Sequence, residues 1–346
     1  MKHPWANVLI LLLGAVEVST GLLGLIHGSP GWVSALNIHR VCGFGLVALL
    51  LWKGRNILAS LAGLRKRKGI PATHLGSLVL LSLLLVSLGL GLAWSHAGRF
   101  SFAGFSGVSW HIYLSLAMAP LLLWHTLRQR WTLRPRFWAE RRFALRLAGL
   151  AVAGLVLWRV SEAANQVLAL PGHDRRSTGS YERGSFSGNA FPTTSWLNDN
   201  PKPLDSEGWS LEVGGHVRGH LRLDHRQVEG YQDRLTATLD CTGGWYSTQE
   251  WDGIRLKTVL ERAGMGPDAA SVTVRSVTGY ARRFSLEEAE GYLLATHVGG
   301  EPLSHRHGFP LRLVAPGKRG YDWVKWVTAV EVNDTGKWWQ PPLPLT

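Results

Sequence analysis

The stretch Thr238-Leu239-Asp240-Cys241-Thr242-Gly243-Gly244-Trp245-Tyr246 decides how the second half of this chain is interpreted. It has the pattern of a strand that ends at Cys241 and runs into a glycine-rich turn. The chain has one other cysteine, Cys42, which lies in an apolar run typical of a membrane helix, so we expect no disulfide between the two. A thiol placed after a strand in this way can act as a nucleophile or a metal ligand, and the alternative is a buried, inert cysteine.

The half of the chain that precedes this stretch is far more apolar than the half that contains it. Five apolar runs occur at about residues 6–27, 37–62, 74–95, 109–127 and 144–160. Each is close to the ~20 residues that a helix needs to cross a bilayer. The first run is too long, and lacks the small-residue cleavage site, for a signal peptide that is removed. We therefore predict an N-terminal all-α bundle of five transmembrane helices.

The formal net charge of +13 comes largely from clusters between these apolar runs. Arginine and lysine crowd the loops at 65–68 and 128–142, whereas the loops at 28–36 and 96–108 carry only Arg99. Since positive loops stay on the cytoplasmic side, we predict a multi-pass protein of the bacterial inner membrane, with a cytoplasmic N-terminus and a periplasmic C-terminal domain. Membrane lipid is the expected surrounding, and the charge pattern does not indicate a nucleic-acid partner.

Histidines near the ends of the predicted helices are candidates for haem ligands, because ionisable groups within a membrane are functional by default. His111 and His125 are 14 residues apart on one helix, which puts them on one face about 21 Å apart. Helix bundles hold haem b between two histidines in this way. The alternative is that these side chains are polar anchors at the membrane interface.

Topology suggests how the histidines pair. His39 and His111 lie at the outer helix ends and His74 and His125 at the inner ends, so we predict an outer and an inner haem iron held by these pairs. His96 is the reserve ligand on the outer side. Whether the protein holds one haem or two stays open. The runs Ile38–Gly43 and 110–125 resemble those of bacterial membrane cytochromes b.

The second half reads as a soluble α+β domain, because strands dominate it and helices are few. Its predicted strands are 209–217, 234–240, 271–277, 292–298, 311–315 and 326–332, and its predicted helices are 255–263 and 285–290. We divide the chain into a cytochrome b-like domain at 1–135, a fifth helix at 136–165, a linker and wrap-around segment at 166–208, and the soluble domain at 209–346 with 185–208.

Several motifs of the soluble half occur in series: Cys241-Thr-Gly-Gly-Trp, Trp251-Asp-Gly-Ile-Arg-Leu, 307–317, Gly320-Tyr321 and 323–327. This series resembles the sulfite oxidase family of molybdopterin enzymes over about residues 185–335. It is most similar to the bacterial branch that holds the catalytic subunit of periplasmic methionine sulfoxide reductase. The resemblance implies a molybdenum-dependent oxidoreductase with an external metal site.

The resemblance also implies a set of site residues. Cys241 is the expected thiolate ligand of a molybdenum ion held by a pterin dithiolene. The remaining contacts to this molybdopterin fall on Asn189, Pro192, Thr193, Ser276, His307, Arg312, Trp323, Val324 and Lys325. Arg312 suits a phosphate group by paired hydrogen bonds, and Lys325 suits it as a point charge.

Two positions depart from the pattern of the methionine sulfoxide reductase branch, and they put the substrate in doubt. Gly243 stands where that branch has an acidic residue, and His307 stands where it has an amide. Four further side chains are weaker candidates for facing the substrate, and each is as readily explained as structural: Tyr246, Tyr280, Arg282 and Arg283.

Export raises a separate question, because the resemblance implies a cofactor assembled in the cytoplasm. Arg141 and Arg142 precede the fifth apolar run and resemble an internal twin-arginine signal, although ordinary positive-inside charge explains them as well. The expected function is electron passage between a quinone or quinol pool, b-type haem and the molybdenum site, with oxygen-atom transfer on a small sulfoxide or oxoanion.

Reduction is favoured over the sulfite-oxidising direction, because the motifs resemble the reductase branch. A non-catalytic haem electron carrier or sensor is the alternative of another class. The substrate, the oligomeric state and any periplasmic redox partner stay open at this point.

Overall fold

The computed structural model describes residues 4–65, 72–128, 134, 141–195, 199–341 and 343–344. The chain divides into two compact units. The first comprises Met1–Leu25 and Gly31–Gly179, and the second comprises Ile26–Pro30 and Ser180–Thr346.

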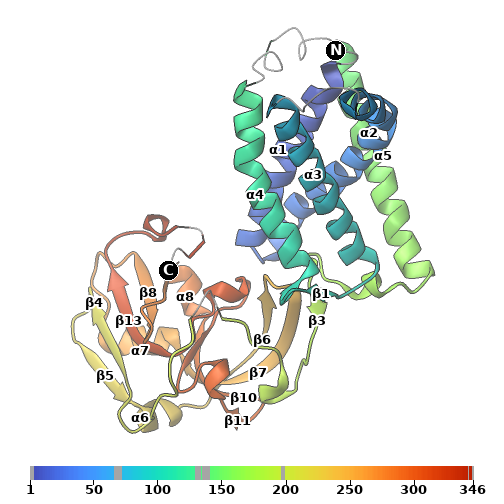
Figure 1. The fold of residues 1–346 in the computed structure, drawn as a ribbon. Coiled ribbons are helices and arrows are strands. Elements are labelled where there is room, and N and C mark those ends of the chain that lie inside the picture. The colour runs from blue at the N-terminus through green and yellow to red at the C-terminus, as the bar shows by residue number, and fades with distance from the viewer. Residues whose placement is uncertain are drawn as a thin grey trace. The chain divides into compact units, whose positions relative to one another are not determined.

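The first unit is built from five long helices (Figure 1). They are α1 (Pro4–Ile26), α2 (Val33–Arg65), α3 (Ala72–His96), α4 (Gly107–Arg128) and α5 (Arg141–Val167). All five are long and apolar enough to cross a membrane. They lie close to the five predicted runs, and their outward faces carry many exposed leucine and valine side chains. A soluble bundle would bury these side chains, so the exposure suits a surrounding of lipid.

Small residues allow close helix packing in this unit. Helix α2 packs along α5, and α3 packs along α4. Helices α3 and α4 are connected by the short hairpin of β1 (Ser101–Phe102) and β2 (Phe105–Ser106). A Cβ atom at Gly154 of α5 would stand 2.2 Å from the carbonyl oxygen of Val41 on α2. The two backbones therefore touch at a position where any side chain would separate them.

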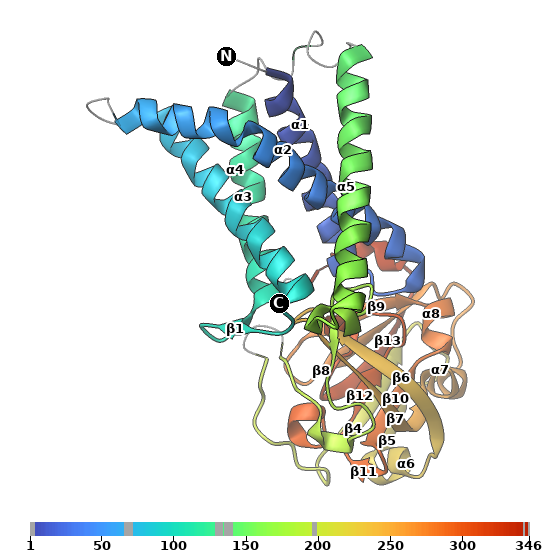
Figure 2. The same ribbon diagram turned by 90° about the vertical axis from the view of Figure 1, so that its right-hand side faces the viewer.

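The second unit contains two sheets (Figure 2). One sheet has the order β11-β10-β7-β3, with β12 added to β10 and β6 to β7. The other has the order β5-β4-β13-β8-β9. The strands are β3 (Tyr181–Glu182), β4 (Ser210–Gly215), β5 (Leu221–Asp224), β6 (Asp233–Cys241), β7 (Trp245–Arg255), β8 (Ser271–Ser276), β9 (Ala281–Ser285), β10 (Leu293–Val298), β11 (Glu301–Pro302), β12 (Arg312–Val314) and β13 (Val327–Asn333).

Pairing in both sheets is mainly antiparallel. Among the described strands, β3 with β7 and β4 with β13 are the parallel pairs. The helices are few and short: α6 (His225–Glu229), α7 (Leu256–Ala263) and α8 (Leu286–Glu290). One apolar core, which includes Trp251, Phe284 and Leu293, draws side chains from both sheets. This arrangement agrees with the predicted α+β class.

The six predicted strands and two predicted helices all coincide, within a few residues, with observed elements. The sequence pattern did not indicate β5, α6, β9 or β7, although β7 is the longest strand. Residues 246–250 of β7 are mostly polar, and their alternation is masked because Ser247 and Gln249 occupy its buried positions. Strand β7 forms a hairpin with β6 in which Cys241 faces Trp245 across the ladder.

Candidate functional site

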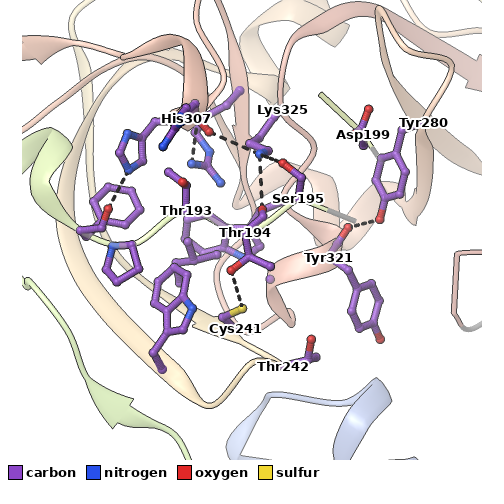
Figure 3. A pocket seen from close by; sticks show the side chains of 18 residues that line it. Thr193, Thr194, Ser195, Asp199, Cys241, Thr242, Tyr280, His307, Tyr321 and Lys325 are labelled. Carbon is purple, nitrogen blue, oxygen red and sulfur yellow. Dashed lines mark hydrogen bonds between the residues drawn. The ribbon is translucent and has the colours of Figure 1, made fainter. Parts of the chain in front are cut away.

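A pocket opens in the second unit at the end of the β6–β7 hairpin (Figure 3). It encloses about 650 Å³ of empty space, counted with its open mouth, which suits a small-molecule ligand. Its walls come from four places in the sequence: the segment 191–199, the hairpin around Cys241, Tyr280, and the segment 306–325. Residues far apart in the chain thus meet around one thiol.

Cys241 is the last residue of β6 and lies buried at the base of this pocket. Its sulfur accepts a hydrogen bond from the backbone nitrogen of Gly243 at 3.3 Å and lies 3.7 Å from the hydroxyl of Thr194. Burial raises the pKa of the Cys241 thiol, and the Gly243 and Thr194 contacts oppose that rise. These two donors are suited to stabilise a sulfur that carries negative charge.

A buried ion pair supports the backbone beneath Cys241. Arg319 bonds the Asp240 carboxylate at 2.8 Å, and the Ser180 hydroxyl donates to the same oxygen at 2.7 Å. A Cβ atom at Gly320 would lie 3.2 Å from the Cα of Cys241, so the 319–320 segment packs directly on the end of β6. The position of the thiol is therefore held from below by a charge pair that no local pattern indicates.

Arg312 is a buried cation without a carboxylate partner among the described residues. One of its terminal nitrogens donates to the carbonyl of His307 at 2.9 Å, while its Nε, also buried, has no hydrogen-bond partner. The guanidinium lies over the rings of Trp251 and Trp323, at 5.1 and 5.8 Å from their centres. Burial lowers the pKa of Arg312 to about 9. An unpaired buried charge is costly, and an anion in the pocket would compensate it.

Lys325 is the second cation of this wall. Its amine donates to Ser195 at 3.0 Å and to the carbonyls of Thr194 and Arg306 at 3.3 Å (Figure 3). Burial, followed by repulsion from Arg312, lowers the pKa of Lys325 to about 8. Repulsion between the two cations gives a second reason for an anionic ligand here.

Gly308 lets the two cationic segments approach each other. Its φ is +111°, and a Cβ atom there would lie 3.0 Å from the Cβ of Arg312 and 3.1 Å from that of Lys325. A side chain at this position would strain the backbone and push the two segments apart.

His307 lines the pocket, but both of its ring nitrogens are already occupied. Nδ1 lies 2.7 Å from the Ser304 hydroxyl, and Nε2 lies 3.0 Å from the carbonyl of Phe191. Since a carbonyl only accepts, Nε2 carries the proton and Nδ1 accepts from Ser304. Burial, followed by repulsion from Arg312, lowers the pKa of His307 to about 4. The ring is therefore neutral, and it holds segment 191 against the strand that carries Arg312.

The side of the pocket away from His307 is rich in oxygen atoms. Tyr280, Tyr321 and Asp199 lie on this side in Figure 3, and Thr242 lies beside Cys241. The hydroxyl of Tyr280 donates a hydrogen bond to the carbonyl of Tyr321, and burial raises the pKa of the Tyr280 hydroxyl. Asp199 has a buried carboxylate oxygen without a hydrogen-bond partner.

Seven of the ten side chains that the resemblance assigns to the molybdenum site line this single pocket: Pro192, Thr193, Cys241, His307, Arg312, Trp323 and Lys325. The other three lie outside its lining. Asn189 bonds Pro302 and Ser304, Ser276 accepts hydrogen bonds from Thr278, and Val324 packs in the core. The structure offers no pocket contact for the side chains of these three residues.

Of the four weaker candidates for the substrate side, only Tyr280 lines the pocket. Arg282 pairs with buried Asp322 at 2.7 Å, and Arg283 bonds Thr273, Thr335 and Asn333. Tyr246 lies on β7 outside the lining. Arg282 and Arg283 are thus accounted for by structural contacts, and Tyr246 is placed outside the pocket.

Sequence reasoning missed several lining residues: Thr194, Ser195, Asp199, Thr242, Trp245, Arg306 and Tyr321. Some signal was available. Thr194 and Ser195 directly follow the predicted contact Thr193, and Tyr321 belongs to the Gly320-Tyr321 motif of the resemblance. Asp199, by contrast, is one acid among several in an irregular segment.

A second candidate site lies in the first unit, where the rings of His39 on α2 and His111 on α4 meet. Their centres are 6.0 Å apart and their planes are nearly perpendicular. Two imidazole nitrogens that each lie ~2 Å from one metal ion place their ring centres on the order of 6 Å apart. The predicted outer pair is thus at the separation that a shared iron requires.

The proton positions of these two histidines also suit metal ligands. His39 Nδ1 lies 3.0 Å from a carboxylate oxygen of Glu17 and 3.1 Å from its carbonyl, and His111 Nδ1 lies 2.8 Å from the carbonyl of Ser87. These oxygens accept hydrogen bonds, so Nδ1 carries the proton in both rings and Nε2 keeps its lone pair. Within the described residues, neither Nε2 forms a hydrogen bond.

In the predicted inner pair, the side chain of His74 lies outside the described residues. Its proposed partner His125 stands in the last turn of α4. His96, the reserve ligand, faces Asn165 of α5 at 2.6 Å and so has a structural partner away from the His39–His111 pair. No cluster of three or more metal-binding side chains occurs in the part of the chain that the structure describes.

Comparison with known proteins identifies relatives of the second unit. The family model described as "Oxidoreductase molybdopterin binding domain" matches residues 198–338. The uncharacterized oxidoreductase YuiH of Bacillus subtilis (strain 168) is 30% identical over 168 residues, which cover 45% of this chain and 85% of YuiH.

Two further relatives carry a named activity. The protein-methionine-sulfoxide reductase catalytic subunit MsrP of Gluconobacter oxydans (strain 621H) is 31% identical over 176 residues, or 44% of this chain and 54% of that protein. The mitochondrial sulfite oxidase of Macaca fascicularis is 34% identical over 170 residues, or 39% of this chain and 31% of that protein. The matched region therefore spans about half of the first of these two relatives and about a third of the second.

Proposed function

We propose that this chain, which belongs to the sulfite oxidase family of molybdopterin oxidoreductases, is a membrane-bound enzyme that reduces a neutral sulfoxide. In this proposal electrons come from a membrane quinol by way of b-type haem in the first unit. The oxygen-atom chemistry takes place in the pocket around Cys241. The chain would thus hold donor and acceptor sites in one molecule, which raises their effective concentration for each other.

The observation that carries the proposal is the unpaired buried cation of the pocket. Arg312 has an orphaned Nε, and Trp323 beside it has a buried ring nitrogen without a partner. Both nitrogens are hydrogen-bond donors, and both residues line the pocket together with Lys325. An anionic phosphate at this wall would take up these donors, while Cys241 at the base supplies a soft thiolate. The residues present therefore fit a molybdopterin, and the metal would supply two-electron oxygen-atom transfer.

The chain's own contribution to the reaction is to hold the thiol and the substrate. The Gly243 nitrogen and the Thr194 hydroxyl stabilise charge on the sulfur of Cys241, and the Asp240–Arg319 pair fixes its backbone. Tyr280 and Thr242 present oxygen atoms to the same pocket. Such groups can orient a sulfoxide oxygen and hold a proton near it.

The charge distribution of the pocket favours a sulfoxide over an oxyanion. The cations Arg312 and Lys325 lie close to each other, as the repulsion from Arg312 that lowers the pKa of Lys325 indicates. Arg319 is paired with Asp240, and Asp199, whose buried Oδ1 has no hydrogen-bond partner, adds a carboxylate to the lining of the pocket. With Arg312 and Lys325 taken up by the phosphate of the cofactor, sulfite would meet the Asp199 carboxylate in the same pocket, which disfavours an oxyanion. The name of MsrP, a methionine sulfoxide reductase, supports the same direction.

The membrane half supports an electron-transfer role. His39 and His111 have the separation and the proton positions that suit one b-type haem, which would supply one-electron transfer. The arginine-rich segments around 65–68 and 128–142 favour a cytoplasmic N-terminus and a periplasmic second unit. Arg141 and Arg142 begin α5, where an internal twin-arginine signal would have to stand.

A sulfite-oxidising enzyme is the second candidate, and the similarity to sulfite oxidase favours it. A haem carrier or sensor without catalysis is weaker, because such a protein has no need of a thiol aimed into a pocket lined by unpaired cations.

The test uses the purified full chain in detergent, as wild type and as Cys241→Ser. We expect molybdenum near one per chain, a b-type reduced-minus-oxidised spectrum, and quinol-dependent reduction of a neutral sulfoxide that Cys241→Ser abolishes. The haem spectrum of Cys241→Ser should match wild type. Haem without molybdenum, from a host that makes the cofactor, would leave an electron carrier; sulfite oxidation without sulfoxide reduction would establish the second candidate.

A further inference from the structure

Glu17 is an acidic side chain in the middle of α1, which is long and apolar enough to cross a membrane. Its carboxylate lies 3.0 Å from Nδ1 of His39, and its other oxygen, Oε1, is buried without a hydrogen-bond partner. Within the described residues, no arginine or lysine forms a salt bridge with it. A carboxylate in this setting costs free energy, and side chains of this kind mark functional positions.

The two histidines of the pair are held in matching ways by neighbouring helices. On α1, the carbonyl of Glu17 accepts from His39, and a Cβ atom at Gly21, four residues on, would lie 3.2 Å from the His39 ring. On α3, the carbonyl of Ser87 accepts from His111, and a Cβ atom at Gly91, again four residues on, would lie 3.3 Å from the ring. Each imidazole thus lies against a glycine with its Nδ1 bound to the carbonyl one turn earlier.

The surroundings of the two histidines differ in the second group that lies near Nδ1, beside the backbone carbonyl. The neutral hydroxyl of Ser87 lies 3.2 Å from Nδ1 of His111, and it also forms a hydrogen bond with the Ser115 hydroxyl at 2.7 Å. His39 receives the Glu17 carboxylate at 3.0 Å, and the Thr20 hydroxyl lies 3.3 Å away. The geometry is shared, and the charge is placed on one side only.

We infer that Glu17 is a positioning residue that sets the reduction potential of the haem held by His39 and His111. This inference rests on the proposed haem site. A carboxylate that accepts the Nδ1 proton makes His39 a more basic ligand, and a negative charge beside the site favours the more positive, ferric iron. Glu17 therefore lowers the potential and makes the reduced haem a stronger electron donor.

The experiment is a redox titration of the haem in the purified full chain, for wild type and Glu17→Gln. Glutamine keeps the size of the side chain and can still accept from Nδ1 through its amide oxygen, so mainly the charge changes. We expect haem content to be preserved and the midpoint potential to rise. The equilibrium constant for haem reduction should increase about tenfold, which is about 59 mV for a one-electron couple.

Three matched variants separate charge from packing. Ser87→Ala removes the neutral hydroxyl on the other histidine and leaves the carbonyl contact, so its potential should stay at the wild-type value. Glu162→Gln removes a carboxylate from α5 that pairs with Arg175 and contacts no histidine, and it should also leave the potential unchanged. Glu17→Asp keeps the negative charge, so its midpoint potential should lie closer to that of wild type than to that of Glu17→Gln.

The outcomes distinguish this inference from the proposed function. If wild type holds no haem, the proposed haem site is wrong. If haem is present and Glu17→Gln titrates at the wild-type potential, the role of Glu17 is wrong and the haem proposal stands. An equal rise in Glu162→Gln would also overturn the inference, because the effect would then be that of any charge in the membrane half.

Discussion

The pocket around Cys241 and the His39–His111 pair hold their candidate ligands by opposite means. In the pocket, two cations and an indole nitrogen share one wall, and buried donors are left over. In the helical unit, the two imidazoles have their Nδ1 protons bound, and their Nε2 lone pairs are left over. Leftover donors suit an anion such as a phosphate, and leftover lone pairs suit a metal ion.

His307 sharpens this comparison, because both of its ring nitrogens form hydrogen bonds within the protein. Its two ring nitrogens bond Ser304 and the carbonyl of Phe191, whereas His39 and His111 each use Nδ1 alone. A count of satisfied nitrogens thus separates a structural histidine from two candidate ligands, although all three stand in segments that the sequence marks as functional. The following predictions run from the largest expected effect to the smallest.

The largest effect should come from removal of a ligand histidine. His39→Ala and His111→Ala should each abolish the b-type spectrum of the outer haem while molybdenum content stays at the wild-type level. His96→Ala should keep this haem, because His96 bonds Asn165. The measurement is the pyridine haemochrome assay together with metal analysis. Full haem content in both single variants would break the assignment of lone pairs to a metal.

The next effect concerns the unpaired cation. Arg312→Met should lower molybdopterin retention by roughly 10- to 100-fold, since hydrogen bonds to charged groups contribute about 1.5–3 kcal/mol. The same change should not destabilise the cofactor-free protein, because it removes a buried charge that no carboxylate of the described residues compensates. Metal analysis and thermal unfolding check the two statements. Arg283→Met, outside the pocket, is the control and should retain the cofactor.

A smaller effect should follow from the pH dependence of His307 in the cofactor-free protein. Its pKa is about 4 in the folded state, below the ordinary 6.5, so the unfolded chain binds the proton more readily. Stability is therefore lost as pH falls from about 6.5 towards 4, by an amount on the order of 1–3 kcal/mol. Urea unfolding at several pH values in this range gives the free energy of unfolding as a function of pH. This free energy should fall less steeply with falling pH for His307→Gln than for wild type. Equal slopes would show that the ring does not stay neutral.

The smallest effect should come from the glycine that lies against His111. Gly91→Ala puts a methyl group 3.3 Å from the ring and should weaken haem retention several-fold. Gly89→Ala lies on the same helix with open space at its Cβ, so it serves as the matched control. Haem loss during dialysis is the measurement. Similar losses in both variants would mean that helix α3 itself, rather than contact with His111, sets the result.

Sequence reasoning reached most of the fold, and it did so where the signal is local. Twenty-residue apolar runs predict membrane helices whatever their neighbours are, and the strand before Cys241 is visible from its own alternation. Strand β7 was missed because its polar residues Ser247 and Gln249 are buried by pairing with distant segments, such as Gly184. A polar side chain in a buried strand position cannot be recognised until its partner is known.

The sequence by itself determined that five apolar helices precede a mainly β unit and that Cys241 ends a strand before a glycine-rich turn. It also supplied the resemblance that named Arg312 and Lys325. Only the tertiary structure decided that Arg312 has no carboxylate partner among the described residues while Arg319 has Asp240, that the rings of the predicted pair His39 and His111 lie 6.0 Å apart, and that Glu17 touches His39. The reason is physical: hydropathy and period act along the chain, whereas the satisfaction of a buried charge depends on which distant residue the fold brings within about 3 Å.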